Sequence, residues 1–219
     1  MSRISVPIFP LPGLVLYPHT HLPLHIFEPR YVELIRDVLA GDQYMATANI
    51  RQTNDASETA KPRIHNVLTQ ARIVDYEELP EDRYFVMLEG ICRIKLIEEI
   101  PTDPYRTVLA ATLTDELFQE DRVAINEARE SLLQNAKLLA ERSQDLKARL
   151  SNLQNTHLHP GIIADVVASQ VVRDPYTRQS LLEQTNILRR LRMVDIQLKS
   201  IMTGQMMKRD AWQSDTDVV

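Results

Sequence analysis

The sequence has little cysteine: Cys92 is the single one in 219 residues. One thiol cannot form an internal disulfide or a cysteine-based zinc site, and such a low count fits a reducing compartment. Because Cys92 lies between apolar residues in a run with strand character, an inert buried thiol is the favoured interpretation over a reactive one. No apolar run approaches the length of a membrane span, and the amino terminus has no signal-peptide pattern. These absences predict a soluble, cytoplasmic protein that does not contact membranes.

Glycine is also scarce, with five residues at positions 13, 41, 90, 161 and 204. A phosphate-binding G-x-x-x-x-G-K-[ST] loop and a G-x-G-x-x-G dinucleotide fingerprint both require closely spaced glycines, so neither can be present. No G-x-S-x-G nucleophile elbow occurs either. We therefore expect no cofactor and no ATPase motor.

An excess of positive charge is absent as well. The formal net charge is −5, from 25 Lys and Arg against 30 Asp and Glu, which gives no general attraction to nucleic acid or anionic lipid. Arg189, Arg190 and Arg192 form one small basic cluster. Without aromatic residues interleaved, this cluster is interpreted as a solvated helix face that pairs with acids. The prediction is that nucleic acid is not a partner, although nucleic-acid binding stays an alternative function.

Three histidines lie close together in the sequence. His19, His21 and His25 share strand parity, and H-x-H on a strand is a known metal-binding arrangement. However, Pro18 and Pro23 disturb regular pleating, and no cysteine or carboxylate completes an obvious ligand set. Edge and core histidines are therefore preferred and no metal is expected, while a hydrolase or metal site around them remains a second alternative.

What is present is organised around the stretch Pro10–Ile35. Leu14–Tyr17 and Leu22–Phe27 are short apolar runs with strand character, and each adjoins or contains a proline. Proline has no N–H for a central ladder, so these strands are expected at an edge or at bulges. From Pro29 the apolar spacing becomes helical, and Gly41 is suited to end that helix.

Further extended runs follow this stretch. They are Ile4–Phe9, Tyr44–Ile50, Ile64–Val74 and Tyr105–Leu113. Tyr84–Leu88 and Ile91–Ile97 form a predicted hairpin that turns near Glu89-Gly90, and alternation places Tyr84, Val86 and Leu88 on one face. The polar segment Arg51–Arg63 reads as an exposed loop. Six or more short strands with one embedded helix indicate a small barrel or a pair of sheets.

The helical period takes over near residue 115. Apolar residues recur at steps of three, four or seven from Ile125 to Leu153, as in a packing seam, and predict either one long helix from about 117 to 155 or a break around Arg142–Asp145. A short apolar helix is expected over Ile162–Val172. A last helix, capped by Asp174 and Pro175, is expected to run to about Met202 and to end at Gly204. The expected division is a β-domain over 1–114, a helical subdomain over 115–204 and a flexible tail over 205–219.

Within these elements, PHTHLPLHIFEPRYVELI resembles the opening signature of the Lon protease amino-terminal, substrate-binding domain. That domain also occurs as a free-standing protein, the form suggested here, and within cereblon. Leu79–Leu96 and Asp174–Leu198 are similar to two later segments of the family, in the same order. One departure is the absence of glycine from Ile64–Val74, where the family has a glycine-containing strand. The resemblance implies an α+β fold, with a PUA-like β-pseudobarrel that contains one helix and a C-terminal α-helical bundle.

The same resemblance implies a non-catalytic module that recognises polypeptides, without ATPase or protease parts. It carries over structural roles alone: Phe27 and Tyr31 as core anchors, Glu28 and Arg30 as a polar lock, and Gly90 as the hairpin turn. Glu28 also lies near the positive end of the following helix, within reach of Arg30. The alternatives stay open: a PUA-like nucleic-acid binder, or the histidine-centred hydrolase or metal enzyme.

Leu14, Tyr17 and Pro18 are the predicted polypeptide-binding residues. They lie in a proline-rich edge where apolar side chains are hard to bury, and an incompletely paired strand accepts an added peptide strand. Burial beneath the helices is the competing interpretation for the same three residues. The expected partner is a polypeptide segment or a protein, and the chain itself is expected to be a monomer or a weak homodimer.

Overall fold

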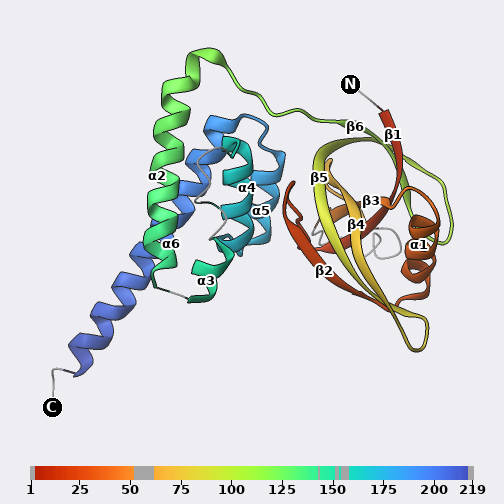
Figure 1. The fold of residues 1–219 in the computed structure, drawn as a ribbon, viewed down its shortest axis with the longest axis horizontal. Helices are drawn as coiled ribbons and strands as arrows, with labels where there is room; N and C mark the ends of the chain where they lie inside the picture. The colour runs from red at the N-terminus through yellow and green to blue at the C-terminus, as the bar shows by residue number, and fades with distance from the viewer. Residues whose placement is uncertain (1–2, 52–61, 143, 151–152, 154–157, 217–219) are drawn as a thin grey trace. The chain divides into compact units, whose positions relative to one another are not determined.

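The computed structural model describes residues 3–51, 62–142, 144–150, 153 and 158–216, with side chains described up to residue 204. The chain forms two compact units (Figure 1). The strand unit comprises residues 1–114 and 174–185, and the helical unit comprises residues 115–173 and 186–219. Residues 52–61 of the predicted loop over 51–63, and residues 217–219 of the predicted tail, lie outside the described residues.

The strand unit contains one six-stranded sheet. Its strands are β1 (Arg3–Pro12), β2 (His21–Ile26), β3 (Tyr44–Ile50), β4 (Val67–Leu79), β5 (Arg83–Ile100) and β6 (Thr107–Thr112). Their order is β2-β5-β4-β3-β1-β6, and a further β5–β6 pairing closes the sheet into a barrel with β2 at its edge. The β1–β3 pair is parallel and the other pairs are antiparallel. The predicted α+β class is therefore confirmed.

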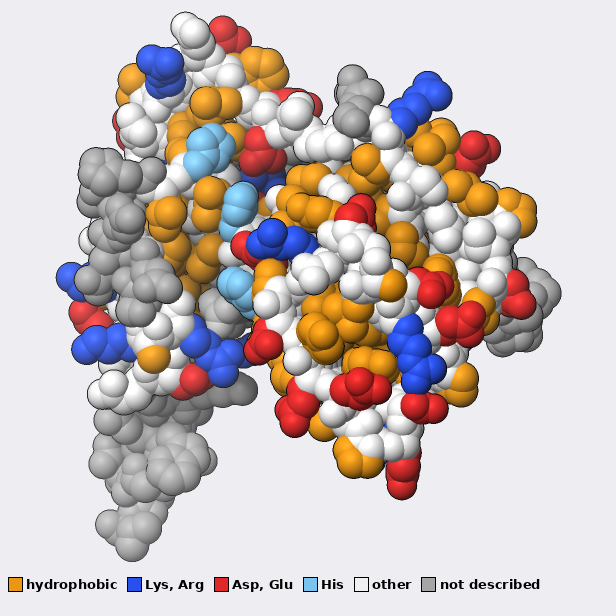
Figure 2. Space-filling view, turned by 45° about the vertical axis from the view of Figure 1, so that its right-hand side comes forward, with side chains coloured by type: hydrophobic (Ala, Val, Ile, Leu, Met, Phe, Trp, Pro, Cys, Tyr) orange, Lys and Arg blue, Asp and Glu red, His pale blue; other side chains and the backbone are white. Residues whose placement is uncertain are grey.

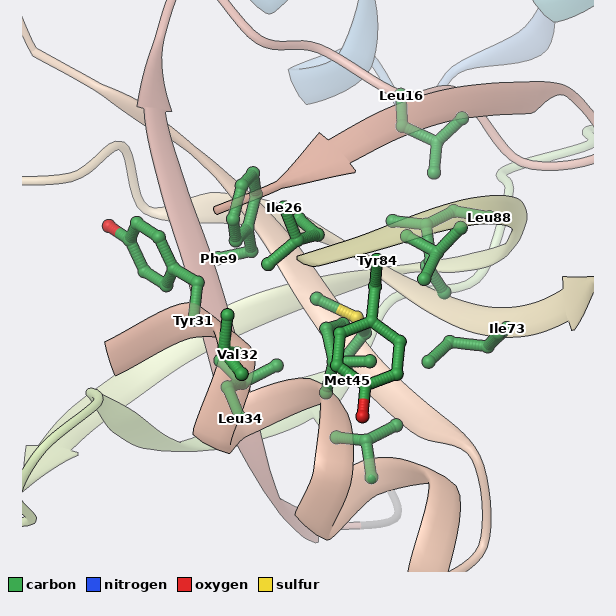
Figure 3. Packing of buried hydrophobic residues seen from close by; sticks show 14 residues of the cluster. Phe9, Leu16, Ile26, Tyr31, Val32, Leu34, Met45, Ile73, Tyr84 and Leu88 are labelled. Atoms are coloured by element: carbon green, nitrogen blue, oxygen red, sulfur yellow. The ribbon is translucent and has the colours of Figure 1, made fainter. Parts of the chain in front are cut away.

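Helix α1 (Pro29–Ala40) follows β2 and covers part of the barrel core. Pro29 stands in its first turn and Gly41 caps its end, as the sequence predicts. Its buried residues recur at helical spacing and include Tyr31, Val32 and Leu34. Figure 3 shows these side chains in one cluster with Phe9 and Ile26 from the strands.

Strand β5 corrects the predicted hairpin. It runs without a turn from Arg83 to Ile100. It pairs with β2 over residues 84–89, with β4 over residues 83–95 and with β6 over residues 94–100. The reversal of the chain lies earlier, between β4 and β5, where Glu81 and Asp82 both adopt positive φ angles of 63° and 54°. Gly90 is thus a mid-strand residue, not a turn residue.

The close approach of another backbone segment accounts for Gly90. A Cβ atom at this position would overlap the carbonyl oxygen of Tyr17. The His19 N–H donates to the Gly90 carbonyl at 2.7 Å, and the Gly90 N–H donates to the Thr20 carbonyl at 2.9 Å. Glycine within a strand often marks such a contact, and here it admits the segment between β1 and β2.

The helix expected over residues 175–202 is two helices. Asp174 caps α5 (Pro175–Glu183) as predicted, accepting a hydrogen bond from the Thr177 N–H at 2.7 Å. Gln184 then adopts an extended conformation, and α6 (Ile187–Thr216) begins after it. The apolar period continues across this break, so periodicity did not reveal it.

Helix α5 belongs to the strand unit, which differs from the predicted helical subdomain over 115–204. Arg178 donates to the Val15 carbonyl at 2.6 Å, and the Tyr17 hydroxyl donates to the Arg178 carbonyl at 2.9 Å. At the other end of α5, the buried Arg93 guanidinium on β5 donates to the Leu182 carbonyl at 2.8 Å. The first two bonds join α5 to residues 15–17, and the third satisfies a carbonyl of the last turn of α5, which has no partner within the helix.

The helical unit contains α2 (Arg122–Ala140), α3 (Gln144–Arg149), α4 (Pro160–Val171) and α6, with a short 3₁₀ turn over Gln119–Asp121. The long seam is interrupted after Ala140, close to the predicted break. Helix α6 passes through Gly204 and extends to Thr216, so Gly204 is not a stop. A glycine inside a helix costs about 1 kcal/mol relative to alanine but does not by itself end the helix.

One arginine of the predicted basic cluster lies in the core of the helical unit. The Arg190 side chain is fully buried and donates to Asp115 at 2.9 Å, and its Nε atom lies 3.2 Å from a carboxylate oxygen of the buried Asp165. Arg189 and Arg192 are exposed. The predicted solvated face is therefore wrong for Arg190, because burial and acidic partners fix it as an internal ion pair.

Candidate functional site

The predicted polypeptide-binding edge is largely internal. Residues Leu14–Pro18 form no strand; Tyr17 and Pro18 are buried, and Leu14 is half-buried. The Thr69 hydroxyl on β4 donates to the Leu16 carbonyl at 2.5 Å, in addition to the bonds from α5. The prediction that Leu14, Tyr17 and Pro18 present a free edge is therefore wrong, since α5 and the barrel satisfy this segment.

The predicted anchors of the corner between β2 and α1 have different positions. Tyr31 is buried and packs on Phe9 with ring centroids 4.5 Å apart, and burial raises the pKa of its hydroxyl. Phe27, by contrast, is 62% exposed, so its predicted core role is wrong. Alternation explains this, because Ile26 of β2 points inward and Phe27 follows it. The predicted pair is present: Arg30 lies 2.8 Å from Glu28, both exposed.

The three histidines are all exposed. His19 has a positive φ of 60°, while His21 and His25 lie on the outward face of β2. Within the part of the chain that the structure describes, no group of three His, Cys, Asp or Glu side chains is placed to hold a metal ion. The His25 ring instead lies 5.8 Å from the Phe27 ring, which makes it part of an aromatic surface.

That surface continues across two strands. Pro23 and His25 on β2 are paired with Met87 and Phe85 on β5, and Phe27 follows β2 directly. We call these five residues the outer face. Phe27 and Phe85 are 62% and 41% exposed, Met87 is half-buried, and Pro23 and His25 are exposed. On the face of the molecule drawn in Figure 2, hydrophobic side chains lie at the surface beside acidic ones.

A column of charged side chains borders the outer face on β4. Glu77 is paired with Phe85, Asp75 is paired with Met87, and Arg72 is paired with Glu89. Directly opposite residues on neighbouring strands have side chains about 5 Å apart. Aromatic and aliphatic groups on β2 and β5 therefore lie next to carboxylates on β4, all directed to solvent.

Sequence reasoning missed Phe85, Met87, Asp75 and Glu77. The signal for the first two was available, since the prediction that Tyr84, Val86 and Leu88 point inward is confirmed by their burial and implies that residues 85 and 87 point outward. The outward positions of Asp75 and Glu77 on β4 could not be predicted from alternation, because a register shift between Ile73 and Asp75 changes which β4 residues face outward.

A cavity of about 500 Å³ lies beside the corner and is lined by Arg30, Tyr31, Pro104, Tyr105 and Arg106, among others. Both arginines of its lining are paired with carboxylates: Arg30 with Glu28, and Arg106 with Glu99 at 2.6 Å. The Tyr105 hydroxyl donates to Asp37 at 2.5 Å, which raises the pKa of Tyr105 to about 12. The two arginines that line this cavity thus have acidic partners within the chain.

Cys92 is half-buried on β5. Burial raises the pKa of its thiol, and the Sγ atom donates to Gln70 on β4 at 3.4 Å. A raised pKa lowers the thiolate fraction at neutral pH, so this cysteine has the character of a structural thiol rather than a nucleophile.

Of the helices in the described residues, none has the length and hydropathy needed to cross a membrane.

Comparison with known proteins gives relatives over most of the chain. Lon protease 2 of Myxococcus xanthus is 26% identical over 189 residues, which are 86% of this chain and 23% of that protein. The Lon protease of Desulfosudis oleivorans is 30% identical over 195 residues, 89% of this chain and 24% of that protein. The chain thus spans about a quarter of the length of the curated relatives it matches.

Solved structures show the same fold. The N-terminal domain of the Mycobacterium avium complex Lon protease has a TM-score of 0.68 at 16% identity, covering 90% of this chain and 98% of that one. A Lon N-terminal domain protein from Xanthomonas campestris has a TM-score of 0.58 at 21% identity, covering 87% of this chain and 96% of that one. The family model of the ATP-dependent protease La (LON) substrate-binding domain matches residues 5–200. The chain therefore belongs to the LON substrate-binding domain family.

Proposed function

We propose that this chain is a non-catalytic module that recognises polypeptides, and that it binds apolar segments on the outer face. The observation that carries the proposal is the exposure of Phe27 and Phe85 together with Pro23, His25 and Met87 on one side of a sheet. Contiguous exposed apolar surface on a soluble domain marks an interaction site. Membership in a family of substrate-binding domains supports the same function.

Contacts through side chains fit this surface better than addition of a strand. The Gly90 N–H donates to the Thr20 carbonyl, so the backbone groups of Thr20 face β5. Because these groups alternate in direction along an antiparallel strand, those of His21, Pro23 and His25 point away from β5, to the edge of the sheet. Pro23 has no N–H and interrupts that edge at its centre. A polypeptide that lies across the outer face avoids this gap and contacts the aromatic rings instead.

Polypeptide is preferred over nucleic acid as the partner. The predicted basic cluster is split by the burial of Arg190, and the net charge of the sequence is −5. Nucleic-acid binding relies on Lys and Arg side chains that neutralise phosphates. A cytoplasmic location and a monomeric or weakly dimeric state remain predictions from the sequence.

Fluorescence anisotropy with a labelled, reduced and carboxymethylated model polypeptide tests the proposal. We expect saturable binding by the parent protein, and at least a tenfold loss of affinity (about 1.4 kcal/mol) for the double variant Phe27→Ser, Phe85→Ser. Val123→Ser is the matched control, because Val123 on α2 is 72% exposed but lies in the helical unit. Its affinity should equal that of the parent.

Two results would contradict the proposal. The first is equal polypeptide affinity for the parent and the Phe27, Phe85 double variant. The second is tight binding of an RNA pool, measured in parallel, that weakens steeply as salt increases.

A further inference from the structure

We infer that the outer face selects polypeptide segments in which a lysine or arginine lies close to an apolar side chain. This inference rests on the proposed function and adds to it the chemical class of the bound segment. The apolar side chain contacts Phe27 and Phe85, and the basic side chain pairs with Asp75 and Glu77.

Asp75 and Glu77 carry negative charge that the neighbouring residues leave uncompensated. Both are exposed, and neither has a hydrogen-bond or ion-pair partner among the described residues. The nearby arginines are already paired with other carboxylates. These pairs are Arg72 with Glu89 at 3.2 Å, Arg83 with Glu81 at 3.5 Å, Arg36 with Asp82 at 2.7 Å and Arg30 with Glu28 at 2.8 Å.

The apolar and acidic groups are directly adjacent. The register aligns His25, Phe85 and Glu77 in one row across β2, β5 and β4, and Pro23, Met87 and Asp75 in the next. Neighbouring strands are about 4.8 Å apart, so about 10 Å separates the aromatic end of a row on β2 from its carboxylate on β4.

This separation sets the spacing in the bound segment. A polypeptide in the polyproline II conformation advances about 3.1 Å per residue and has about three residues per turn. A chain that crosses the strands in this conformation therefore spans the row in about three residues and presents the first and the fourth side chain on the same face. An apolar residue over Phe27 and His25 thus places the side chain three positions further along near Glu77. Lysine or arginine at that position gains an opposite charge, whereas glutamate meets two like charges.

Charge complementarity also selects among possible occupants. An anionic membrane surface or a nucleic acid presents phosphates to the same carboxylates and is repelled. A polypeptide offers both an apolar and a cationic group within one short segment, which is the combination that the outer face and its acidic border present.

Three labelled peptides test the inference by fluorescence anisotropy. They share a glycine- and serine-based sequence with one phenylalanine and differ only three positions after it, where lysine, glutamine or glutamate stands. For the parent protein at about 0.1 M salt we expect the lysine peptide to bind about tenfold more tightly than the glutamate peptide. The ratio should shrink at about 1 M salt, where charges are screened beyond about 3 Å.

The double variant Asp75→Asn, Glu77→Gln should remove the preference for lysine and leave the affinity for the glutamine peptide unchanged. Glu127→Gln with Glu130→Gln is the matched control: it removes two exposed carboxylates from α2 in the helical unit and should retain the preference. Melting curves of all variants should coincide, because the altered side chains are exposed.

The outcomes separate the two proposals. Equal affinity of the parent for the lysine and glutamate peptides, with the glutamine peptide also bound, overturns the charge selection alone. If the Asp75, Glu77 variant keeps the preference for the lysine peptide, other residues cause that preference, and the inference is overturned as well. Binding of none of the three peptides overturns both the inference and the proposed function.

Discussion

Two proline-containing apolar stretches lie within 15 residues of each other in the sequence, yet they have opposite environments. Leu14–Pro18 is largely internal and is held by α5 and β4. The stretch from Pro23 on β2 to Phe27 just after it, with its pairing partners on β5, presents an exposed apolar surface. Composition does not distinguish the two. The difference lies in what covers each stretch, and the covering residues are distant in sequence.

Truncation of one aromatic residue in each stretch tests the difference in burial between them. Tyr17→Ala should lower the free energy of unfolding by about 3–5 kcal/mol, because Tyr17 is fully buried. Phe27→Ala should change it by less than about 0.5 kcal/mol, because Phe27 is 62% exposed. Urea denaturation followed by circular dichroism measures both values. Equal losses for the two variants would show that the contrast in burial is wrong.

The second test concerns the contact that brings the internal stretch to the barrel. Gly90→Ala should destabilise the protein by about 2–3 kcal/mol, because the added Cβ overlaps the Tyr17 carbonyl and one of the two backbones must shift. Gly204→Ala is the matched control, since nothing lies within 4 Å of a Cβ at that position on α6. It should stabilise by up to about 1 kcal/mol.

Thermal melting of both glycine variants beside the parent gives the result. A Gly90→Ala protein that melts at or above the parent temperature would mean that the backbone of residues 16–17 does not depend on this approach.

The smallest effect is expected at the corner between the two stretches. Glu28→Ala removes the ion pair with Arg30, and the side chains of both residues are 40% and 54% exposed. Exposed pairs contribute little, so the free energy of unfolding should fall by no more than about 0.5 kcal/mol. Chemical denaturation at low and high salt measures this value. A loss above 2 kcal/mol would identify the pair as a structural lock after all.

Several parts of the fold could be predicted from the sequence, because they depend on local physics. Pro29, the apolar spacing after it and Gly41 define α1. Tyr44–Ile50 is predicted and observed with the same bounds. Asp174 and Pro175 mark the start of α5. The resemblance of the corner motif to the Lon substrate-binding domain is confirmed by the family match.

The candidate site could be predicted only in part. The inward positions of Tyr84, Val86 and Leu88 follow from alternation, and the outward positions of Phe85 and Met87 are their direct consequence. Alternation does not say whether an outward face is covered by another layer. The core position of Phe27, which the resemblance implied, was wrong because alternation directs Ile26 inward and Phe27 outward, and Phe27 is exposed there.

The sequence by itself determined the helix and strand periods, the capping residues, the family and the lack of nucleotide-binding motifs, because each depends on residues a few positions apart. Tertiary structure decided the role of Gly90, the assignment of α5 to the strand unit, the burial of Arg190 and the pairing of the outer face with Asp75 and Glu77. In the first three cases the deciding partner lies tens of residues away, and in the last the register shift within β4 decides which carboxylates stand opposite Phe85 and Met87. Strand register and long-range packing place these partners, and neither leaves a periodic signal in the chain.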